Sequence, residues 1–274
     1  MSVTKTSQKA ASGIGEETAI AFAEAGCRGV VFADFDENGA CAVADKSKEY
    51  AKHPSYRGLG IRVDVTDESS VENMAETTFK EFGRIDYSVN SAGACNDGGN
   101  PTSNQELEPF EKVLKTNVTG IMLCVRAVSK IMAKQEPRTY SGRKGERSLG
   151  RGSIVNVGSL NSNIASPGLL PYVTSKFAVM GITKTAALDL MSSQVRVNAV
   201  CPGWVDTPLL QGGLQRNPKI GEYIQELVPH GRIASPEEIA DYIVFACSPS
   251  ASYINGTGTI IDAGLSLTVH RASL

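Results

Sequence analysis

The sequence predicts an α/β protein with a parallel, doubly wound sheet between two layers of helices. Short apolar runs alternate with longer stretches in which apolar residues recur at helical spacing, and repeated strand–helix units of this kind build parallel sheets. The 274-residue chain has 41% hydrophobic and 20% charged residues, which is ordinary globular usage. We therefore expect a Rossmann-like fold in three layers, with residues 1–274 forming a single domain.

The predicted elements follow one another in a regular order. Two glycines open the first helix, expected over residues 13–25, and Gly26 follows where a helix end favours a residue that tolerates positive φ. Later helices are expected over residues 38–52, 67–82, 107–133, 171–191 and 236–246. Strands are expected over residues 29–33, 59–63, 85–89, 153–158, 195–200 and 259–262.

The sequence ahead of the first helix makes a poor strand. Residues 1–12 contain one valine, no alternating apolar face and many polar residues. A polar side chain that is buried in a central strand without a partner costs about 1 to 3 kcal/mol. We therefore expect an irregular N-terminal segment, with the first strand degraded or missing.

Two further segments stand out from the repeated units. Residues 136–151 are polar and rich in glycine and arginine, so an exposed insertion loop is expected there. Its basic side chains also leave an anion-binding role open. Residues 204–230 include the pair Leu209 and Leu210, and we expect this segment to cover a substrate pocket as a lid.

The composition argues against several classes of function. The formal net charge is -2 and the pI is about 6.0, so no concentrated basic surface is available for a nucleic acid or an acidic membrane. The sequence has neither an apolar run of about 18 residues nor a signal-peptide pattern. The three histidines lie far apart and the six cysteines form no C-x-x-C pair, so no metal site is expected. We expect a cytoplasmic protein that binds a small molecule.

The strongest chemical signal is a tyrosine and a lysine four residues apart, Tyr172 and Lys176. One helical turn places the two side chains on the same face, about 6 Å apart at the backbone. A nearby cation favours a phenolate and lowers the tyrosine pKa toward the range of an acid/base catalyst. Ser159, at the end of the preceding strand, can donate a hydrogen bond to the same substrate oxygen. By itself this spacing also fits an ordinary surface pair.

Six motifs, in order along nearly the whole chain, resemble those of the short-chain dehydrogenase/reductase family. They are Gly13-Ile14-Gly15, Asn90-Ser91-Ala92-Gly93, Thr116-Asn117-Val118, the strand end at Ser159, Tyr172-Val173-Thr174-Ser175-Lys176 and Pro202-Gly203-Trp204-Val205-Asp206-Thr207. The insertion before Gly152 resembles that of many fungal members, which favours a role in secondary metabolism. The resemblance implies an oxidoreductase that transfers a hydride between a nicotinamide cofactor and a secondary alcohol or ketone.

The resemblance implies a role for each of four catalytic residues. Tyr172 would exchange a proton with the substrate oxygen, and Lys176 would hold the nicotinamide ribose and lower the tyrosine pKa. Ser159 would polarise the substrate oxygen, while Asn117 would position a water molecule in a proton relay. The implied cofactor-binding residues are Ser12, Gly13, Ile14, Gly15, Asp34, Asp64, Val65, Asn90, Ala92, Gly93, Tyr172, Lys176, Pro202, Gly203, Val205 and Thr207.

The choice of cofactor is expected to depend on Asp34, at the end of the second predicted strand. A carboxylate there accepts hydrogen bonds from an adenosine 2'-hydroxyl and repels a 2'-phosphate. Phe35 follows it and Ser12 precedes Gly13, so neither of the places where NADP-using members often carry a basic residue is basic. NAD(H) is therefore favoured over NADP(H). Asp64 would accept a hydrogen bond from the adenine amino group.

One motif departs from the family pattern and keeps other functions open. Gln8 and Lys9 stand where the family has a threonine and its first glycine, although Lys9 could offer a cation to the pyrophosphate. The chain could be an active dehydrogenase or ketoreductase, a non-redox isomerase, lyase or cyclase using Tyr172, or a catalytically silent binding subunit. The complete catalytic set favours the first of these.

The substrate and the assembly are predicted only in outline. Pocket walls are expected at residues 94–104 and 160–170 and after Thr207, with a largely apolar lining that suits a medium-sized secondary alcohol or ketone. Members of the family usually associate through the helices that carry Asn117 and Tyr172. The resemblance therefore implies a homodimer or homotetramer.

Overall fold

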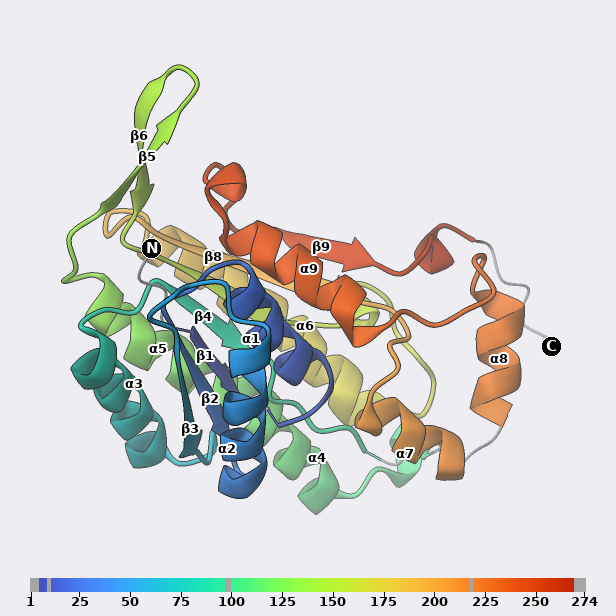
Figure 1. Cartoon of the computed structure of the whole chain (residues 1–274). Coiled ribbons are helices and arrows are strands. Elements are labelled where there is room, and N and C mark those ends of the chain that lie inside the picture. The colour runs from blue at the N-terminus through green and yellow to red at the C-terminus, as the bar shows by residue number, and fades with distance from the viewer. Residues whose placement is uncertain (1–4, 9–10, 97–99, 217–218, 269–274) are drawn as a thin grey trace.

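In the computed structural model, residues 5–8, 11–96, 100–216 and 219–268 are described, and within them seven parallel strands form one sheet (Figure 1). The strand order is β3-β2-β1-β4-β7-β8-β9. The strands are β1 (Lys5–Gln8), β2 (Gly29–Asp34), β3 (Arg57–Arg62), β4 (Tyr87–Asn90), β7 (Gly152–Val157), β8 (Val195–Pro202) and β9 (Gly258–Ile261). The predicted doubly wound parallel sheet is confirmed.

Helices cover both faces of the sheet, which gives the three predicted layers. One face is covered by α1 (Gly13–Glu24), α2 (Glu37–Lys46) and α9 (Pro236–Cys247). The other is covered by α3 (Glu68–Phe82), α5 (Ile121–Met132) and α6 (Leu170–Asp189). Apolar side chains between sheet and helices form two cores, with Phe22, Phe32 and Ile239 in the first and Met74 and Ile154 in the second. Burying such side chains is the main force that holds the layers together.

The first strand forms, which corrects the expectation that it is missing. Thr6 of β1 is in register with Val31 of β2 on one side and with Ser88 of β4 on the other. The physical reason is that a gap between β2 and β4 would leave both strands with unpaired backbone groups, and any sequence can supply the backbone partners. Lys9, considered above as a partner for pyrophosphate, lies outside the described residues.

The polar insertion is a hairpin and not an irregular loop. Strands β5 (Arg138–Gly142) and β6 (Gly145–Gly150) pair antiparallel and project from the body of the molecule (Figure 1). Gly145 has a φ of 105° where the chain turns between them, a conformation that favours glycine. Most of its residues are exposed, and the polar sequence can form the hairpin because cross-strand backbone pairing does not require apolar residues.

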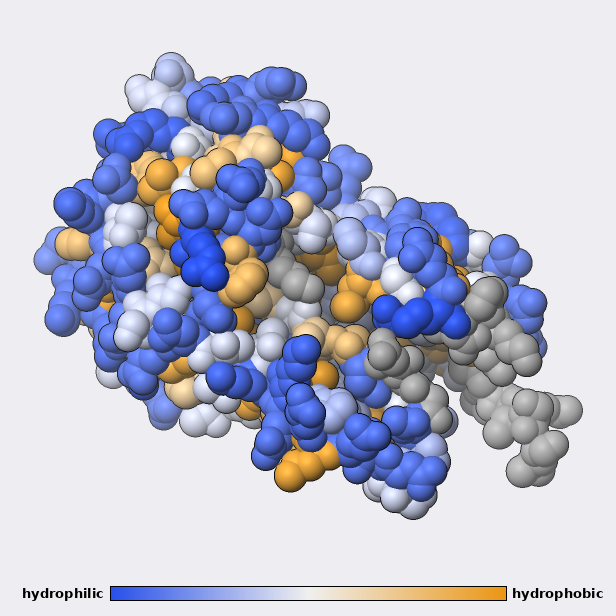
Figure 2. Space-filling view, turned by 90° about the horizontal axis from the view of Figure 1, so that it is seen from below, coloured by the Kyte–Doolittle hydropathy of each residue, from blue (hydrophilic) through white to orange (hydrophobic). Residues whose placement is uncertain are grey.

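The predicted lid segment contains two helices, α7 (Pro208–Arg216) and α8 (Lys219–Leu227). Leu210 of α7 and Ile224 of α8 pack with Leu160 and with the partly buried Trp204 in a small core of their own. This core is separate from the two that hold the sheet. Seen from below, apolar side chains gather in the middle of the face that α7 borders, with hydrophilic side chains around them (Figure 2). The role of residues 204–230 as a lid stays a prediction.

Candidate active site

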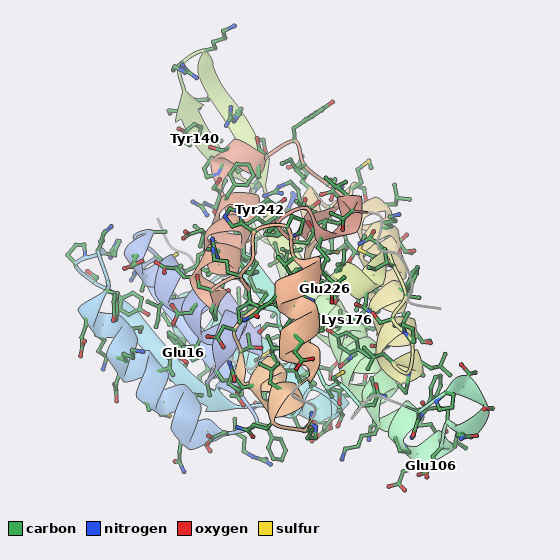
Figure 3. The ribbon with its side chains drawn as sticks, turned by 90° about the vertical axis from the view of Figure 1, so that its right-hand side faces the viewer. Glu16, Glu106, Tyr140, Lys176, Glu226 and Tyr242 are labelled. Atoms are coloured by element: carbon green, nitrogen blue, oxygen red, sulfur yellow. The ribbon has the colours of Figure 1, made fainter. Side chains whose placement is uncertain are left out.

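The four predicted catalytic residues meet at the carboxyl edge of the sheet, where ligands bind in open α/β folds. On α6 the ammonium of Lys176 lies 5.5 Å from the centre of the Tyr172 ring. The same ammonium donates a hydrogen bond of 2.9 Å to the carbonyl oxygen of Val157, at the end of β7. Lys176 is buried in the middle of the molecule, far from Tyr140 on the hairpin (Figure 3). The pair is therefore not a solvated surface pair.

Ser159 follows the end of β7, and its side chain lies close enough to the Tyr172 hydroxyl to influence the Tyr172 pKa. Burial raises the pKa of Tyr172 to about 12, and the neighbouring Ser159 side chain acts in the opposite direction. The predicted net lowering of this pKa by Lys176 is therefore wrong for the chain by itself. Spacing along a helix indicates which side chains are neighbours, but the loss of water around the phenol has the larger effect here.

Asn117 lies in a π-helical segment, Lys115–Gly120, that joins α4 (Leu107–Leu114) to α5. The segment interrupts the single helix predicted over residues 107–133, and such π-helical turns are frequent at functional sites. The fully buried Asn117 amide donates to the carbonyl oxygen of Ala94 at 2.9 Å and to Ser175 Oγ at 2.9 Å. Its oxygen accepts from the Ala94 amide at 2.7 Å. The side chain thus fixes the chain after β4 against α6.

The chain after β4 leaves room above the lysine. A Cβ placed on Gly93 would lie 3.7 Å from Asn117 Oδ1 and 3.8 Å from Lys176 Nζ, so the glycine keeps this space free of a side chain. Ala92 beside it is buried. Asn90 donates 2.7 Å to Asn156 Oδ1 within the sheet, and its amide group therefore faces a neighbouring strand. Sequence reasoning named Asn90 as a cofactor residue and missed this structural role.

The N-terminus of α1 forms one end of the cleft. Gly13 has a φ of 57°, and a Cβ added there would lie only 3.1 Å from Thr207 Cγ2. Both facts require glycine at the first helical position. Ser12 makes no side-chain cap with this helix, and Ile14 and Gly15 complete its first turn. The positive end of a helix dipole with its first backbone amides is a favourable place for a phosphate group.

Asp34 lies at the end of β2, where sequence analysis placed the adenosine ribose. Its carboxylate accepts hydrogen bonds of 3.0 Å from the backbone amides of Ala11 and Asp36, one on each oxygen. Each oxygen keeps further acceptor capacity. The carboxylate therefore holds the loop before α1 and still fits a donor such as a ribose hydroxyl.

A basic residue missed by the sequence analysis lies beside this position. Arg62 of β3 is in register with Asp34, and its guanidinium stacks 4.6 Å from the centre of the exposed Phe35 ring. Only the pairing of β2 with β3 brings these residues together, because they are far apart in the sequence. The region around Asp34 thus carries less net negative charge than the neighbouring sequence indicates.

The remaining predicted cofactor residues line the two sides of the same edge. Asp64 accepts hydrogen bonds of 2.8 Å from the backbone amide and the hydroxyl of Thr66, and the backbone bond is the main cause that lowers its pKa. Val65 packs closely against Gly120. On the other side, Pro202 ends β8, Gly203 lies against Asp262, Val205 is buried and Thr207 contacts Gly13. These groups lie between Asp34 and Thr207 along the carboxyl edge of the sheet.

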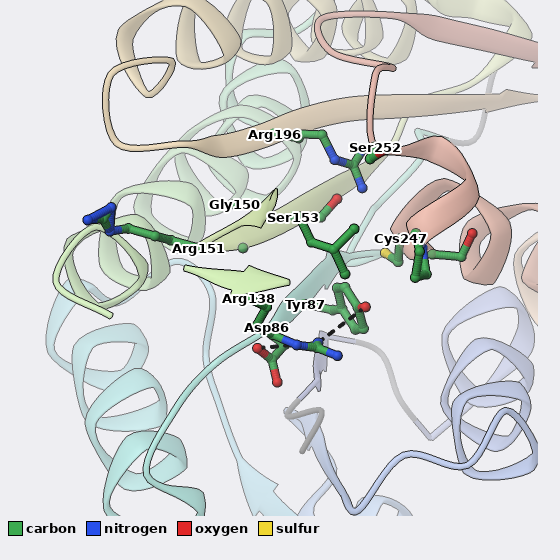
Figure 4. Close-up of a pocket in the computed structure, with 13 residues that line it drawn as sticks. Asp86, Tyr87, Arg138, Gly150, Arg151, Ser153, Arg196, Cys247 and Ser252 are labelled. Atoms are coloured by element: carbon green, nitrogen blue, oxygen red, sulfur yellow. Dashed lines mark hydrogen bonds and ion pairs between the residues drawn. The ribbon is translucent and has the colours of Figure 1, made fainter. Parts of the chain in front are cut away.

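Two cavities lie outside the group of four catalytic residues. One of about 280 Å3 is lined by Trp204, Val228, Ile261 and other residues near the ends of β8 and β9, and none of the four catalytic residues borders it. The other holds only about 20 Å3, at the opposite edge of the sheet beneath the hairpin (Figure 4). A space of that size admits about one water molecule. Neither cavity is the catalytic cleft.

Buried charges at the small cavity attach the hairpin to the sheet. Asp86 is 1% exposed and pairs with Arg84 at 2.8 Å. It also pairs with Arg138 of β5 at 3.5 Å (Figure 4). Arg138 also donates 3.4 Å to the Tyr87 hydroxyl. A second attachment comes from Arg147, which donates 2.8 Å to the carbonyl oxygen of Pro249. Burial is the largest effect on the Asp86 carboxyl and raises its pKa despite the arginines.

We expect Arg138→Ala to destabilise the protein by about 1 to 3 kcal/mol at pH 7, because it leaves a buried carboxylate with one partner fewer. A raised pKa means that the folded state binds more protons than the unfolded state, so stability falls as the pH rises through the Asp86 pKa. The loss caused by Arg138→Ala should therefore be smaller near about pH 4 than at pH 7. Urea unfolding at the two pH values measures this, with the exposed Arg143→Ala as control. The prediction would be contradicted if Arg138→Ala and Arg143→Ala lowered the free energy of unfolding by equal amounts.

Comparison with known proteins agrees with the geometry of the site. Residues 10–266 match the family model described as enoyl-(acyl carrier protein) reductase. The short-chain dehydrogenase anuF of Penicillium roqueforti is 45% identical over 260 residues, which cover 95% of this chain and 94% of that protein. The short-chain dehydrogenase srdC of Neurospora crassa is also 45% identical, over 95% of this chain and 96% of that protein. The crystal structure of levodione reductase has a TM-score of 0.85 and 30% identity, covering 98% of each chain.

The chain belongs to the short-chain dehydrogenase/reductase family. It is an oxidoreductase of the kind that transfers a hydride at an alcohol or ketone, and the family uses NAD(P)(H) cofactors. The predictions of family, fold and reaction type are thereby confirmed, and the non-redox alternative is not favoured. Across the described residues, no helix is both long and apolar enough to cross a membrane.

Proposed function

We propose that the protein is an NAD(H)-dependent ketoreductase that reduces a medium-sized ketone with Tyr172 as the proton donor. The observation that carries the proposal is the meeting of Tyr172, Lys176, Ser159 and Asn117 at one edge of the sheet. Nicotinamide supplies the hydride when it is bound. The Tyr172 phenol is protonated at neutral pH and can therefore act as the proton donor in a reduction.

Each of the four side chains has a separate role around the substrate oxygen. The oxygen gains negative charge during reduction, and the hydroxyls of Ser159 and Tyr172 are donors placed to stabilise that charge. The Lys176 ammonium holds its position through Val157 and faces the space beside Gly93, where a ribose hydroxyl would bind. Asn117 keeps the chain around Ala94 in place. Tyr172 delivers its proton to the substrate oxygen.

The preference for NAD(H) is proposed to come from Asp34. We expect Asp34→Ser to lower kcat/KM with NADH about 10- to 100-fold, since a hydrogen bond to a charged group contributes about 1.5 to 3 kcal/mol. With NADPH, kcat/KM should rise, because the carboxylate that repels a 2'-phosphate is gone. Steady-state kinetics with both cofactors measure the ratio of kcat/KM with NADH to kcat/KM with NADPH.

A nearby carboxylate provides the control for this prediction. Asp36 caps α2 by accepting 3.1 Å from the Gly39 amide, and Asp36→Asn should leave the cofactor ratio unchanged. An unchanged ratio in Asp34→Ser would contradict the assignment and direct attention to Arg62 and Phe35. The whole proposal would be overturned if the folded protein bound neither NADH nor NADPH.

The substrate and the assembly are proposed in broader terms. Leu160 and Leu210 belong to the apolar core of the lid segment, which favours an apolar body attached to the ketone. Exposed apolar side chains on α5 and α6, among them Met122 and Phe177, support association into a homodimer or homotetramer through these helices. We retain a cytoplasmic location as part of the proposal.

A further inference from the structure

The turn that carries Ser159 is closed by a reciprocal pair of hydrogen bonds. Ser159 precedes a short 3-10 helix, Leu160–Ser162. The Ser159 amide donates 3.1 Å to Ser162 Oγ, and the Asn161 amide donates 3.1 Å to Ser159 Oγ. This is the arrangement of a capping box, in which a side chain three residues further on fixes the backbone of the first residue.

The pair also decides where the Ser159 proton points. A serine hydroxyl has one proton to donate and two lone pairs that accept. The Asn161 amide uses one lone pair from the side of the turn. The proton is left to point away from the turn, toward the neighbouring Tyr172 hydroxyl.

Ser162 is itself held by the neighbouring strand and not by solvent. It is 4% exposed, and a Cβ placed on Gly158 would lie 2.9 Å from Ser162 Oγ and 3.1 Å from Cys201 Sγ. Ser162 Oγ and the sulfur of the fully buried Cys201 of β8 thus border the same position, and the Ser162 side chain lies close enough to influence the Cys201 pKa. Cys201 in turn lies 3.9 Å from the sulfur of Met180 on α6. Ser162 thus connects the turn to β8, and through Cys201 to the helix that carries Tyr172.

We propose that Ser162 is a positioning residue that holds the Ser159 hydroxyl in its donating orientation. Ser162 acts through the Ser159 backbone, and its hydroxyl accepts from the Ser159 amide and lies beside Cys201. The inference rests on the proposed roles of Ser159 and Tyr172 and goes beyond them, because no part of the reaction requires contact between Ser162 and the substrate.

The test is a double-mutant cycle on the full-length protein with NADH and a ketone that it reduces. Ser162→Ala should lower kcat about 10-fold, the scale of a small displacement of a catalytic group, and should leave the Kd for NADH unchanged. Ser162→Thr, which keeps a hydroxyl, should recover part of the loss. In a Ser159→Ala background, Ser162→Ala should cause no further loss, because it has no Ser159 hydroxyl left to orient.

A buried serine elsewhere supplies the control for stability. Ser47 is fully buried and donates 2.7 Å to the carbonyl oxygen of Ala44. Ser47→Ala should lower Tm to a similar degree as Ser162→Ala while kcat stays unchanged. If Ser162→Ala does not fold, Ser162→Cys replaces it in the comparison of kcat and Tm with Ser47→Ala. A thiol has a similar size but accepts hydrogen bonds only weakly.

Three results distinguish a failure of the positioning role of Ser162 from a failure of the proposed catalytic site. A second 10-fold loss on adding Ser162→Ala to Ser159→Ala would overturn the positioning role, because the two residues would then act independently. An unchanged kcat in folded Ser162→Ala would also overturn it. If Ser159→Ala and Tyr172→Phe themselves retain full turnover, the proposed catalytic site is wrong, whatever Ser162→Ala does.

Discussion

Replacing Tyr172 with phenylalanine is expected to lower kcat for ketone reduction by about 10²- to 10⁴-fold, the range that a positioned general acid contributes. The ring keeps its packing and loses only the hydroxyl that lies beside Ser159. The Kd for NADH should therefore stay close to the wild-type value. Fluorescence titration with NADH and single-turnover kinetics measure the two quantities separately.

The matched control for this substitution is Tyr242→Phe on α9. The Tyr242 hydroxyl donates a hydrogen bond of 2.6 Å to Thr259 Oγ1, and Thr259 is not one of the four catalytic residues. Loss of the Tyr242 hydroxyl should change Tm slightly and leave kcat unchanged. Normal turnover in Tyr172→Phe would mean that another group or water delivers the proton, and the assignment of the site would fall.

Replacing Lys176 with methionine is expected to lower kcat/KM by about 10²- to 10³-fold, as for the loss of one preorganised donor at a charge that develops during the reaction. Methionine fills a similar volume but cannot donate to the carbonyl oxygen of Val157 or hold a ribose hydroxyl beside Gly93. In contrast to Tyr172→Phe, this variant should also bind NADH more weakly. Kinetics and NADH titration together show whether both effects occur.

Lys184 provides the control on the same helix. It lies eight residues beyond Lys176 and is exposed, so Lys184→Met should change neither kcat/KM nor the Kd for NADH. A Lys176→Met variant that is folded and loses turnover while binding NADH normally would contradict the proposed contact with the ribose. In that case the ammonium would act on the substrate side of the cleft alone.

Hydrophobic periodicity predicted most of the sheet and of the helices that cover it. The strands around Val31, Val155 and Val200 and the helices before and after them are found close to the expected positions. The pattern failed for β1 and for the β5–β6 hairpin. Both are held by backbone pairing, and a polar sequence can form those hydrogen bonds as well as an apolar one.

The residues of the site were predicted better than their surroundings. The motifs around Asn117, Ser159 and Tyr172 named residues that the fold brings together. The position of Arg62 beside Asp34 depends on strand register, which a single sequence does not state. The raised pKa of Tyr172 depends on burial, which the four-residue spacing does not reveal.

The central place of β1 has a consequence for the order of folding during synthesis. Lys5–Gln8 is made before the other strands of the sheet and can pair with β2 as soon as Gly29–Asp34 has followed. Its other neighbour, β4, becomes available only after residues 87–90 are made. Closing such a long loop costs entropy before the contact is gained. The nascent chain must therefore keep one edge of β1 exposed to water, or to a chaperone, until residues 87–90 have been made.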